Sequence, residues 1–180
     1  MKKDIHMKKS SLKITPDTNI GDLLKTYPQL ENELIKMAPP FKKLKNPFLR
    51  KGIGTVASLK HVSSVGNIPI NELINKINTA LGNPASDSSY TVDEYYTPQP
   101  DWFSNEKVVV TIIEEEREDK NIMTLVEVNQ RARNVKKGEI IELVTTFLPA
   151  VGIDVMRKKG YTSWSNKTEK GLTKTYFIEK

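Results

Sequence analysis

Apolar residues recur at helical spacing in several short stretches of the first 85 residues. Ile20, Leu23 and Leu24 share one face of a predicted helix. Thr18 or Asn19 can cap this helix, because the side-chain oxygen of either residue can accept an amide hydrogen of the first turn. Further helices are predicted to begin at Pro28, Pro47, Ser58 and Ile70. Helix ends are predicted at Ala38-Pro39-Pro40, at Gly66 and at Gly82. This pattern predicts a small all-α bundle.

From residue 107 onward, β-branched runs alternate with helical stripes. The β-branched and alternating runs predict four strands, at residues 107–113, 139–145, 161–165 and 173–178. The apolar stripes predict two helices, at residues 123–135 and 149–159. The order β-α-β-α-β-β favours a two-layer sandwich, in which both helices cover one face of a mixed sheet.

The stretch between these two parts contains proline, serine and three tyrosines, and its apolar residues do not recur at helical spacing. This composition indicates a linker. We expect it to dock in part through Tyr95, Tyr96 and Trp102. The predicted fold class is therefore α+β with two domains. The predicted divisions are a flexible tail at 1–12, a helical bundle domain at 13–85, a linker at 86–104 and an α/β sandwich domain at 105–180.

The chain has 180 residues and no cysteine. It therefore has no disulfide, thiolate nucleophile, iron–sulfur ligand or thiolate zinc ligand. Only His6 and His61 provide imidazoles, and no carboxylate flanks His61, so we expect neither a structural metal nor a cofactor. Met1–Ser11 lacks the apolar segment of a signal peptide, and no apolar run is long enough to span a membrane. These features predict a cytoplasmic protein.

The net charge of +6 is unevenly distributed. Residues 1–85 carry a net +8, residues 86–104 a net −4 and residues 105–180 a net +2. No acidic residue occurs between Glu33 and Glu72, whereas seven cations lie there. These cations are Lys36, Lys42, Lys43, Lys45, Arg50, Lys51 and Lys60.

The basic segment 36–60 has two interpretations. It is either an anion-binding surface, with Phe41, Lys43, Arg50 and Lys51 as candidate ligand-binding residues, or a solvated face with Phe41, Leu44 and Phe48 in the core. A helix that begins near Pro47 adds free backbone amides to the first interpretation. Nucleic acid is the less favoured anion, because no recognition-helix or RNA-binding pattern accompanies the charge.

The loop of residues 145–150 follows the second predicted strand and leads into a helix, a position where α/β layers often bind ligands. Phe147, Pro149 and Trp164 are candidate ligand-binding residues, with the two aromatic rings walling one apolar pocket. The alternative is that both rings belong to the core and that Pro149 only starts the helix.

Residues 114–119 hold five carboxylates. They form a solvated loop, a site for a hard cation, or a surface that meets the basic part within the chain or in a dimer. Calcium-loop spacing is absent, which favours the solvated loop over a cation site. The serines lie in no arrangement of nucleophile, base and orienting group, and no glycine-rich phosphate loop is present.

Residues 13–82 resemble the family catalogued as domain of unknown function 1858. The matching pieces are Ile14-Thr-Pro-Asp-Thr-Asn-Ile-Gly-Asp-Leu-Leu, Tyr27-Pro, Phe41-Lys-Lys-Leu-Lys-Asn-Pro-Phe-Leu-Arg-Lys, Val56-Ala-Ser-Leu-Lys-His-Val and Ile70-Asn-Glu-Leu-Ile. Some members carry a cysteine pair after the second helix, which implies a redox role. This chain has Met37-Ala-Pro-Pro-Phe there, so that role does not transfer.

Residues 107–180 resemble the domain-of-unknown-function 2249 group of the SirA/TusA-like superfamily. The resemblance rests on Thr145-Thr-Phe-Leu-Pro-Ala-Val-Gly-Ile-Asp-Val-Met-Arg-Lys-Lys-Gly-Tyr and the following Trp164. Sulfur carriers of this superfamily use a Cys-Pro motif after the first strand. The corresponding Glu114–Met123 stretch has neither residue, so it cannot carry a persulfide.

These observations favour a non-catalytic ligand-sensing or protein-interaction module, which the resemblances associate with a redox system as an accessory or regulatory factor. Anion or nucleic-acid binding through the basic segment is the first alternative, and a divergent relative of sulfur-relay proteins is the second. The expected partner is an unidentified protein or a small anionic ligand. A homodimer is left open, and no membrane partner is expected.

Overall fold

The computed structural model describes residues 12–92, 94–117 and 124–179, with the side chains of residues 44 and 47–50 outside the description. Helices make up the first part, which we call the helical half (residues 12–82). Its α-helices are α1 (Ile20–Thr26), α2 (Glu31–Met37), α3 (Pro47–Val56), α4 (Leu59–Gly66) and α5 (Ile70–Ala80). Two 3-10 helices, η1 (Pro28–Leu30) and η2 (Pro39–Lys45), flank α2. The five predicted helices are confirmed, whereas η2 lies where the prolines predicted only a stop.

Local signals in the sequence position several of these helices. The Asn19 side chain caps α1 by accepting a hydrogen bond from the Asp22 amide at 3.1 Å, as predicted. Ser58 caps α4 together with His61, whose ring nitrogen accepts a hydrogen bond from the Ser58 amide. The end of α4 differs from the prediction by one residue, since Asn67, with a φ of 52°, takes the left-handed position there.

The helical half encloses one hydrophobic core, to which α1, α2, α4 and α5 all contribute. Its fully buried members include Ile20, Leu23, Leu34, Leu59 and Leu73. Two close approaches depend on glycine, because a Cβ on Gly66 would lie 2.5 Å from the Met37 carbonyl oxygen and one on Gly21 would lie 2.7 Å from that of Gly54.

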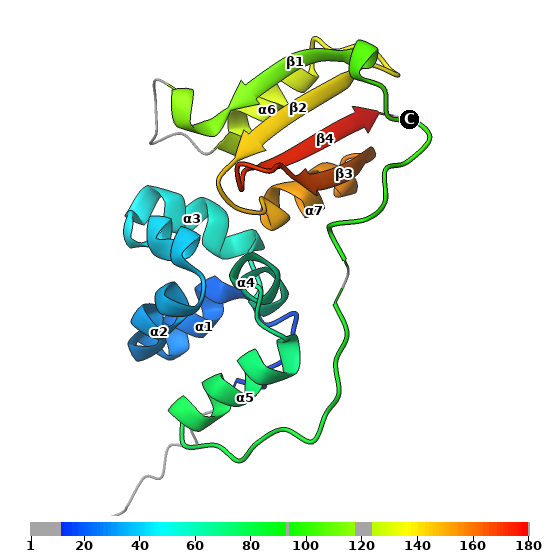
Figure 1. The fold of residues 1–180 in the computed structure, drawn as a ribbon. Coiled ribbons are helices and arrows are strands. Elements are labelled where there is room, and N and C mark those ends of the chain that lie inside the picture. The colour runs from blue at the N-terminus through cyan, green and yellow to red at the C-terminus, as the bar shows by residue number, and fades with distance from the viewer. Residues whose placement is uncertain (1–11, 93, 118–123, 180) are drawn as a thin grey trace, which may run out of the picture.

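The second part, which we call the sheet half (residues 105–179), contains a four-stranded mixed sheet (Figure 1). Its main elements are β1 (Val108–Ile113), α6 (Thr124–Ala132), β2 (Ile140–Thr145), α7 (Ala150–Lys158), β3 (Tyr161–Lys167) and β4 (Thr173–Glu179). Two short 3-10 helices, η3 (Asn105–Lys107) and η4 (Glu114–Glu116), flank β1. The strand order is β1-β2-β4-β3, in which β1 and β2 are parallel and β4 is antiparallel to both of its neighbours. The predicted order of strands and helices is therefore confirmed; Met123, the expected start of α6, lies outside the described residues.

The two faces of the sheet are covered by different segments: helices α6 and α7 cover one face, and residues that precede β1 cover part of the other. On one face, Ile141, Leu143 and Phe177 pack with Val128 of α6 and Ile153 of α7. On the opposite face, the strand residues Ile140, Trp164, Tyr176 and Ile178 form a second cluster. Trp102 and Phe103, which precede β1, pack against this second cluster and cover part of the open face.

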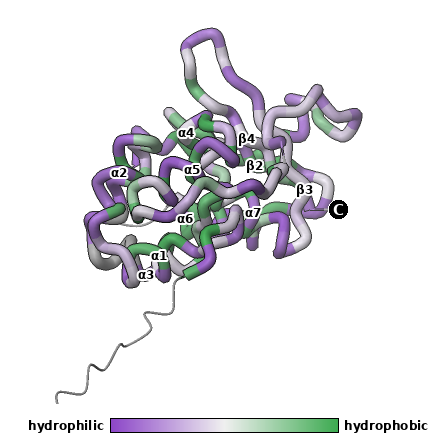
Figure 2. The backbone as a smooth tube through the Cα atoms, turned by 90° about the horizontal axis from the view of Figure 1, so that it is seen from below, coloured by the Kyte–Doolittle hydropathy of each residue, from purple (hydrophilic) through white to green (hydrophobic). Residues whose placement is uncertain are grey.

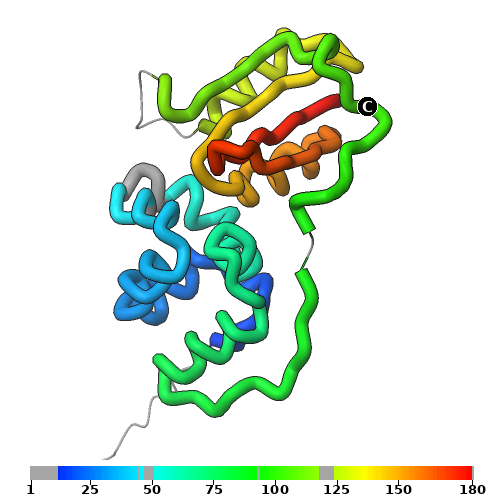
Figure 3. Tube along the Cα trace, viewed as in Figure 1, coloured from blue at the N-terminus to red at the C-terminus, as the bar shows by residue number. Residues whose placement is uncertain are grey.

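The extended stretch after α5 runs along one side of the molecule to reach the sheet (Figure 3). The Tyr95 hydroxyl donates to Asp154 at 3.2 Å, and the Tyr96 hydroxyl lies 3.0 Å from that of Thr173. Tyr96 also forms an isolated bridge with Ser165 of β3. The expected docking through these tyrosines is therefore confirmed.

The helical half lies below the sheet half in Figure 1, with α3 and α4 next to α7. Val65 of α4 packs against the cores of both halves. Hydrophobic and hydrophilic stretches alternate along the backbone in both halves (Figure 2), as expected for elements that bury one side. The junction between the halves therefore continues the apolar packing found within each.

Candidate ligand-binding site

A cavity of about 200 Å³ lies where the two halves meet. The helical half lines it with apolar side chains of η2, α3 and α4, namely Pro40, Phe41, Ile53, Val56 and Val65. The sheet half lines it from α6, β2, β4, α7 and the segment that leads into α7. Its apolar members include Leu125, Val128, Leu143, Phe147, Leu148, Pro149, Val151 and Phe177. The cavity wall is therefore mostly apolar and exists only because both halves contribute to it.

The loop between β2 and α7 has the geometry that the sequence predicted. The strand ends at Thr145 and the helix begins at Ala150. The Thr145 hydroxyl donates to the carbonyl oxygen of Phe147 at 2.5 Å, which fixes the turn at the carboxyl end of the strand. Phe147 and Pro149 therefore reach the cavity from a constrained loop.

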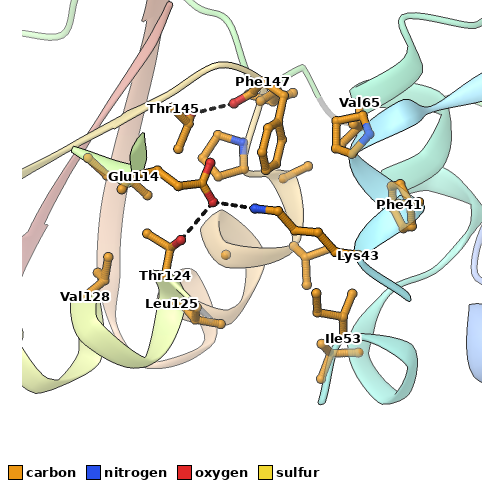
Figure 4. Close-up of a pocket in the computed structure, with 18 of the residues that line it drawn as sticks. Phe41, Lys43, Ile53, Val65, Glu114, Thr124, Leu125, Val128, Thr145 and Phe147 are labelled. Atoms are coloured by element: carbon orange, nitrogen blue, oxygen red, sulfur yellow. Dashed lines mark hydrogen bonds and ion pairs between the residues drawn. The ribbon is translucent and has the colours of Figure 1, made fainter. Parts of the chain in front are cut away.

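Polar groups at one side of the cavity form a continuous network of contacts, of which Figure 4 shows the part made by Lys43, Glu114 and Thr124. Glu114 Oε1 accepts a hydrogen bond from Thr124 Oγ1 at 2.8 Å and lies 2.7 Å from Lys43 Nζ. Arg117 donates from Nη1 to the Thr124 hydroxyl at 2.9 Å and pairs through Nε with Glu127 at 2.7 Å. In this network, Lys43 comes from the helical half, whereas Glu114, Thr124, Arg117 and Glu127 come from the sheet half.

Lys43 also faces an aromatic ring, since its Nζ lies 5.1 Å from the centroid of Phe147. This distance is within the range of a cation–π contact. The Lys43–Glu114 pair confirms one of the three interpretations of the acidic run, which is that it meets the basic part within the chain. Residues 118 and 119 of that run lie outside the described residues.

The structure brings together four of the seven residues predicted to bind a ligand. Phe41, Lys43, Phe147 and Pro149 all line the cavity. Lys51 is exposed and does not line it, and the side chain of Arg50 lies outside the described residues.

The interpretation that Phe147 and Trp164 wall one pocket is wrong. Trp164 lies on the face of the sheet opposite the helices and stacks on Tyr176, with ring centroids 5.2 Å apart. Successive side chains of a strand point to opposite faces, so which residues of β3 face the helices depends on its register with β4. The pairing of β3 with β4 sets that register, and the β3 sequence alone does not predict it.

The cations of the basic segment are dispersed over several partners. Lys36 pairs with Glu33, Lys43 with Glu114, and Lys60 with Asp154, at 2.8, 2.7 and 3.7 Å. Such pairing inside the chain reduces the charge that remains for an external anion.

A second network of polar contacts joins the halves, and it was not predicted from the sequence. Ser58 donates from its amide to His61 Nδ1 at 2.9 Å, and His61 Nε2 lies 3.1 Å from Asp154 Oδ2. Because Nδ1 accepts the amide hydrogen, the Nε2 atom carries the ring hydrogen and donates to Asp154. The Ser58-x-x-His61 spacing of a capping box was the available signal in the sequence; Asp154 lies 93 residues further on.

Burial raises the pKa of Asp154, but hydrogen bonds from His61 and Tyr95 and the charge of Lys60 outweigh it and lower the pKa below its ordinary value. Asp154 is therefore a carboxylate in the ionised state, held by partners from the helical half and from the linker.

Ser58, His61 and Asp154 are the residue types of a hydrolytic triad, with Ser58 Oγ 3.1 Å from His61 Nδ1. However, Ser58 and His61 are buried, and the Ser58 hydroxyl also caps α4. None of the three lines the cavity. The arrangement therefore acts as a clamp between α4 and α7, because a nucleophile has to face its substrate.

The described residues contain no group of three or more histidine, aspartate or glutamate side chains arranged to hold a metal ion. Nor do they include a helix with the length and apolar character needed to cross a bilayer.

The fold and the cavity define an α+β protein with a helical first half and a four-stranded mixed sheet in the second half. Residues 14–74 match a protein-family model described as Domain of unknown function (DUF1858), which confirms the resemblance noted for the helical half. This match covers about a third of the chain. Searches of curated proteins and of solved structures gave no match.

Proposed function

We propose that this protein is a non-catalytic ligand-sensing module that binds a small, mostly apolar molecule in the cavity between its halves. The observation that carries the proposal is a cavity lined by apolar side chains of both halves and bordered by few polar groups. This combination is typical of small-molecule sites, in which apolar walls supply affinity and a few polar groups orient the ligand.

The size of the cavity limits the ligand. An apolar cavity of roughly 150 Å³ holds a benzene molecule. The cavity of about 200 Å³ therefore suits a compact ligand with one ring or a short branched chain.

Because the cavity lies between the two halves, a bound ligand can change how the halves are arranged, and a partner protein can detect that change. A ligand that contacts Phe41 and Val65 from one half and Leu125 and Phe147 from the other stabilises the arrangement of the halves seen in this structure. Anything that binds one arrangement better shifts the population toward it. The output would then be a change in the surface around the junction that a partner protein reads.

The experiment that tests the proposal is native mass spectrometry of the protein purified from its own source, compared with two tryptophan variants. Leu125 lines the cavity from α6, so Leu125→Trp fills it. The next residue, Val126, is 37% exposed and does not line the cavity, so Val126→Trp adds the same side chain outside it.

We expect wild type and Val126→Trp to retain a bound small molecule and Leu125→Trp to lose it. Retention of the same molecule by Leu125→Trp would place binding elsewhere, and the absence of any bound molecule from wild type in its own source would contradict the proposal.

Anion binding through the basic segment has less support, because Lys36, Lys43 and Lys60 are paired within the chain. The SirA/TusA-like assignment of residues 107–180 and the association with a redox system stay predictions that rest on the resemblance. Cytoplasmic location likewise stays a prediction.

A further inference from the structure

The network of polar contacts at the side of the cavity is asymmetric. The Glu114 side chain is 13% exposed, whereas 45% of the Lys43 side chain is exposed. Glu114 has a second bond, from Thr124 at 2.8 Å, within the sheet half. Lys43 reaches the same oxygen from across the junction, on a long side chain with four carbons between backbone and ammonium. The carboxylate is therefore the fixed partner and the ammonium is the one that can leave into water at low cost.

The sheet half holds Glu114 in place without help from Lys43. Arg117 pairs with Glu127 and donates to the Thr124 hydroxyl oxygen. Because that oxygen accepts from Arg117, the hydroxyl hydrogen of Thr124 is directed to Glu114. A carboxylate oriented in this way is preorganised to receive a cation.

An aromatic face completes the surroundings of the ammonium. Phe147 presents its ring to Lys43 Nζ at 5.1 Å, while the carboxylate oxygen of Glu114 lies 2.7 Å from the same nitrogen. A carboxylate and an aromatic face together favour a cation through charge and through the ring quadrupole. Figure 4 shows the Lys43 ammonium reaching the Glu114 carboxylate, with Phe147 and Leu125 also bordering the cavity.

We propose that Glu114, Thr124 and Phe147 form an ammonium-binding subsite, which Lys43 fills in this structure and which a small apolar amine fills when it binds. The proposal rests on the proposed function, since it assigns the chemical class of the ligand for that cavity. The apolar body of the amine occupies the space lined by Leu125, Val65 and Phe41. Its ammonium replaces that of Lys43, so binding exchanges a bond between the halves for a bond to the ligand.

An acid is the opposite alternative. Arg117 also lines the cavity, but it pairs with Glu127 and donates to Thr124, so an acid would have to bind at Lys43. A carboxylate ligand at Lys43 would have to displace Glu114, which is the more buried and doubly bonded partner. It would also face the Glu114 carboxylate if that group stayed in place, and like charges at short range repel.

The test uses three probes of similar shape on the full chain: 2-phenylethylamine, 2-phenylethanol and phenylacetate. Binding is followed at neutral pH by the methyl NMR signals of Leu125 and Val65, which line the cavity. We expect the amine to bind about tenfold more tightly than the alcohol, as a cation–π contact and a charged hydrogen bond together would give. Phenylacetate is expected to bind most weakly.

Two variants assign the preference to the subsite. Lys43→Ala empties the subsite, and we expect it to tighten binding of the amine more than that of the alcohol, because an internal competitor lowers apparent affinity. Glu114→Gln keeps the shape and removes the charge, so the amine should lose its advantage over the alcohol. Lys42→Ala, an exposed neighbour in η2 that does not line the cavity, serves as the control and should bind all three probes as wild type does.

The outcomes separate the two proposals. If the alcohol or phenylacetate binds as tightly as the amine or more tightly, the ammonium subsite is refuted and cavity binding stands. If Lys43→Ala tightens all three probes equally, Lys43 only blocks the entrance, and the subsite is again refuted. If no probe shifts the signals of Leu125 or Val65 in wild type or in Lys43→Ala, the cavity does not admit a one-ring ligand of the size that its volume predicts, and both proposals fail.

Discussion

His61 of α4 donates a hydrogen bond from Nε2 to Oδ2 of Asp154 in α7 at 3.1 Å, and this contact links the helical half to the sheet half. Lys60 approaches the same oxygen at 3.7 Å, and Tyr95 donates to the other carboxylate oxygen. One carboxylate therefore gathers groups from the helical half and from the linker. Its removal should loosen the junction without removing any part of either core.

Asp154→Ala is expected to lower the free energy of unfolding by about 2 kcal/mol, because it leaves a buried imidazole hydrogen and a tyrosine hydroxyl without their charged acceptor. Urea denaturation measures this loss. Asp17→Ala is the matched control: Asp17 also lies 3.7 Å from Lys60, but its side chain is 85% exposed. We expect the control to change the free energy of unfolding by less than about 0.5 kcal/mol. Equal effects of both variants would show that Asp154 does not clamp the junction.

The same carboxylate should make stability depend on pH in the acid range. Its pKa in the folded protein is lower than the ordinary value of 3.8, so the unfolded chain binds the proton more readily. The stability that it contributes is then fully present above about pH 4 and is lost as the pH falls through the lower folded pKa. Asp154→Asn cannot ionise, so the difference in free energy of unfolding between wild type and this variant should shrink below pH 4.

Thermal unfolding of both proteins between pH 3 and pH 7 tests this dependence. Glu142 also has a lowered pKa, since burial, which raises it, is outweighed by hydrogen bonds from Lys174 and Thr111. Its effect is common to both proteins and cancels in the difference. A difference that stays constant down to pH 3 would contradict the role assigned to Asp154.

Short-range features of the fold were predictable from the sequence, and contacts between distant segments were less so. Asn19 and Gly82 marked the start of α1 and the stop after α5, because a cap and a left-handed position need particular residue types. The 3-10 helix η2 escaped prediction, because two prolines at 39 and 40 end an α-helix but are also compatible with the first turn of a new one.

The cavity was predictable in part. Its loop at 145–150 follows from the rule that ligands lie at the carboxyl ends of strands, and the approach of the acidic and basic segments follows from opposite charge. The helical side of the wall, with Val65 and Ile53, could not be placed, since packing between the halves depends on surfaces far apart in the chain. Asp154 carried no local signal either, because a single aspartate between Ile153 and Val155 in an amphipathic helix is usually only part of its solvated face.

Two glycines should respond in opposite directions to the same substitution. A Cβ on Gly66 would lie 2.5 Å from the Met37 carbonyl oxygen, which is backbone and cannot move without shifting the end of α2. Gly66→Ala is therefore expected to cost about 1–3 kcal/mol of stability. A Cβ on Gly152 in α7 would lie 3.8 Å from Leu125 and make ordinary contacts, so Gly152→Ala should stabilise the helix by about 0.5–1 kcal/mol. Opposite changes in melting temperature would support this assignment, and a loss of stability in both variants would contradict it.

Phe103 should hold the linker to the open face of the sheet. Its ring lies 4.7 Å from that of Trp164 and 4.5 Å from that of Tyr176, measured between centroids. The Trp164 indole also donates a hydrogen bond to the Thr97 carbonyl oxygen at 2.9 Å. The linker is therefore held to this face both by aromatic packing and by a hydrogen bond. Phe103→Ala removes the apolar part, and since the ring is only partly buried we expect a loss of about 2 kcal/mol, less than for a fully buried phenylalanine.

Near-ultraviolet circular dichroism should report this change directly, because Trp164 and Tyr176 stack with an interplanar angle of 16° and lose their cover in the variant. Limited proteolysis should also cut the stretch between α5 and η3 faster in Phe103→Ala than in wild type. Gln99→Ala changes an exposed residue of the same stretch and should leave both signals unaltered. If Phe103→Ala leaves the aromatic signal and the cleavage rate unchanged, the polar bonds of Thr97 and Tyr96 are sufficient to hold the linker, and Phe103 is not its anchor.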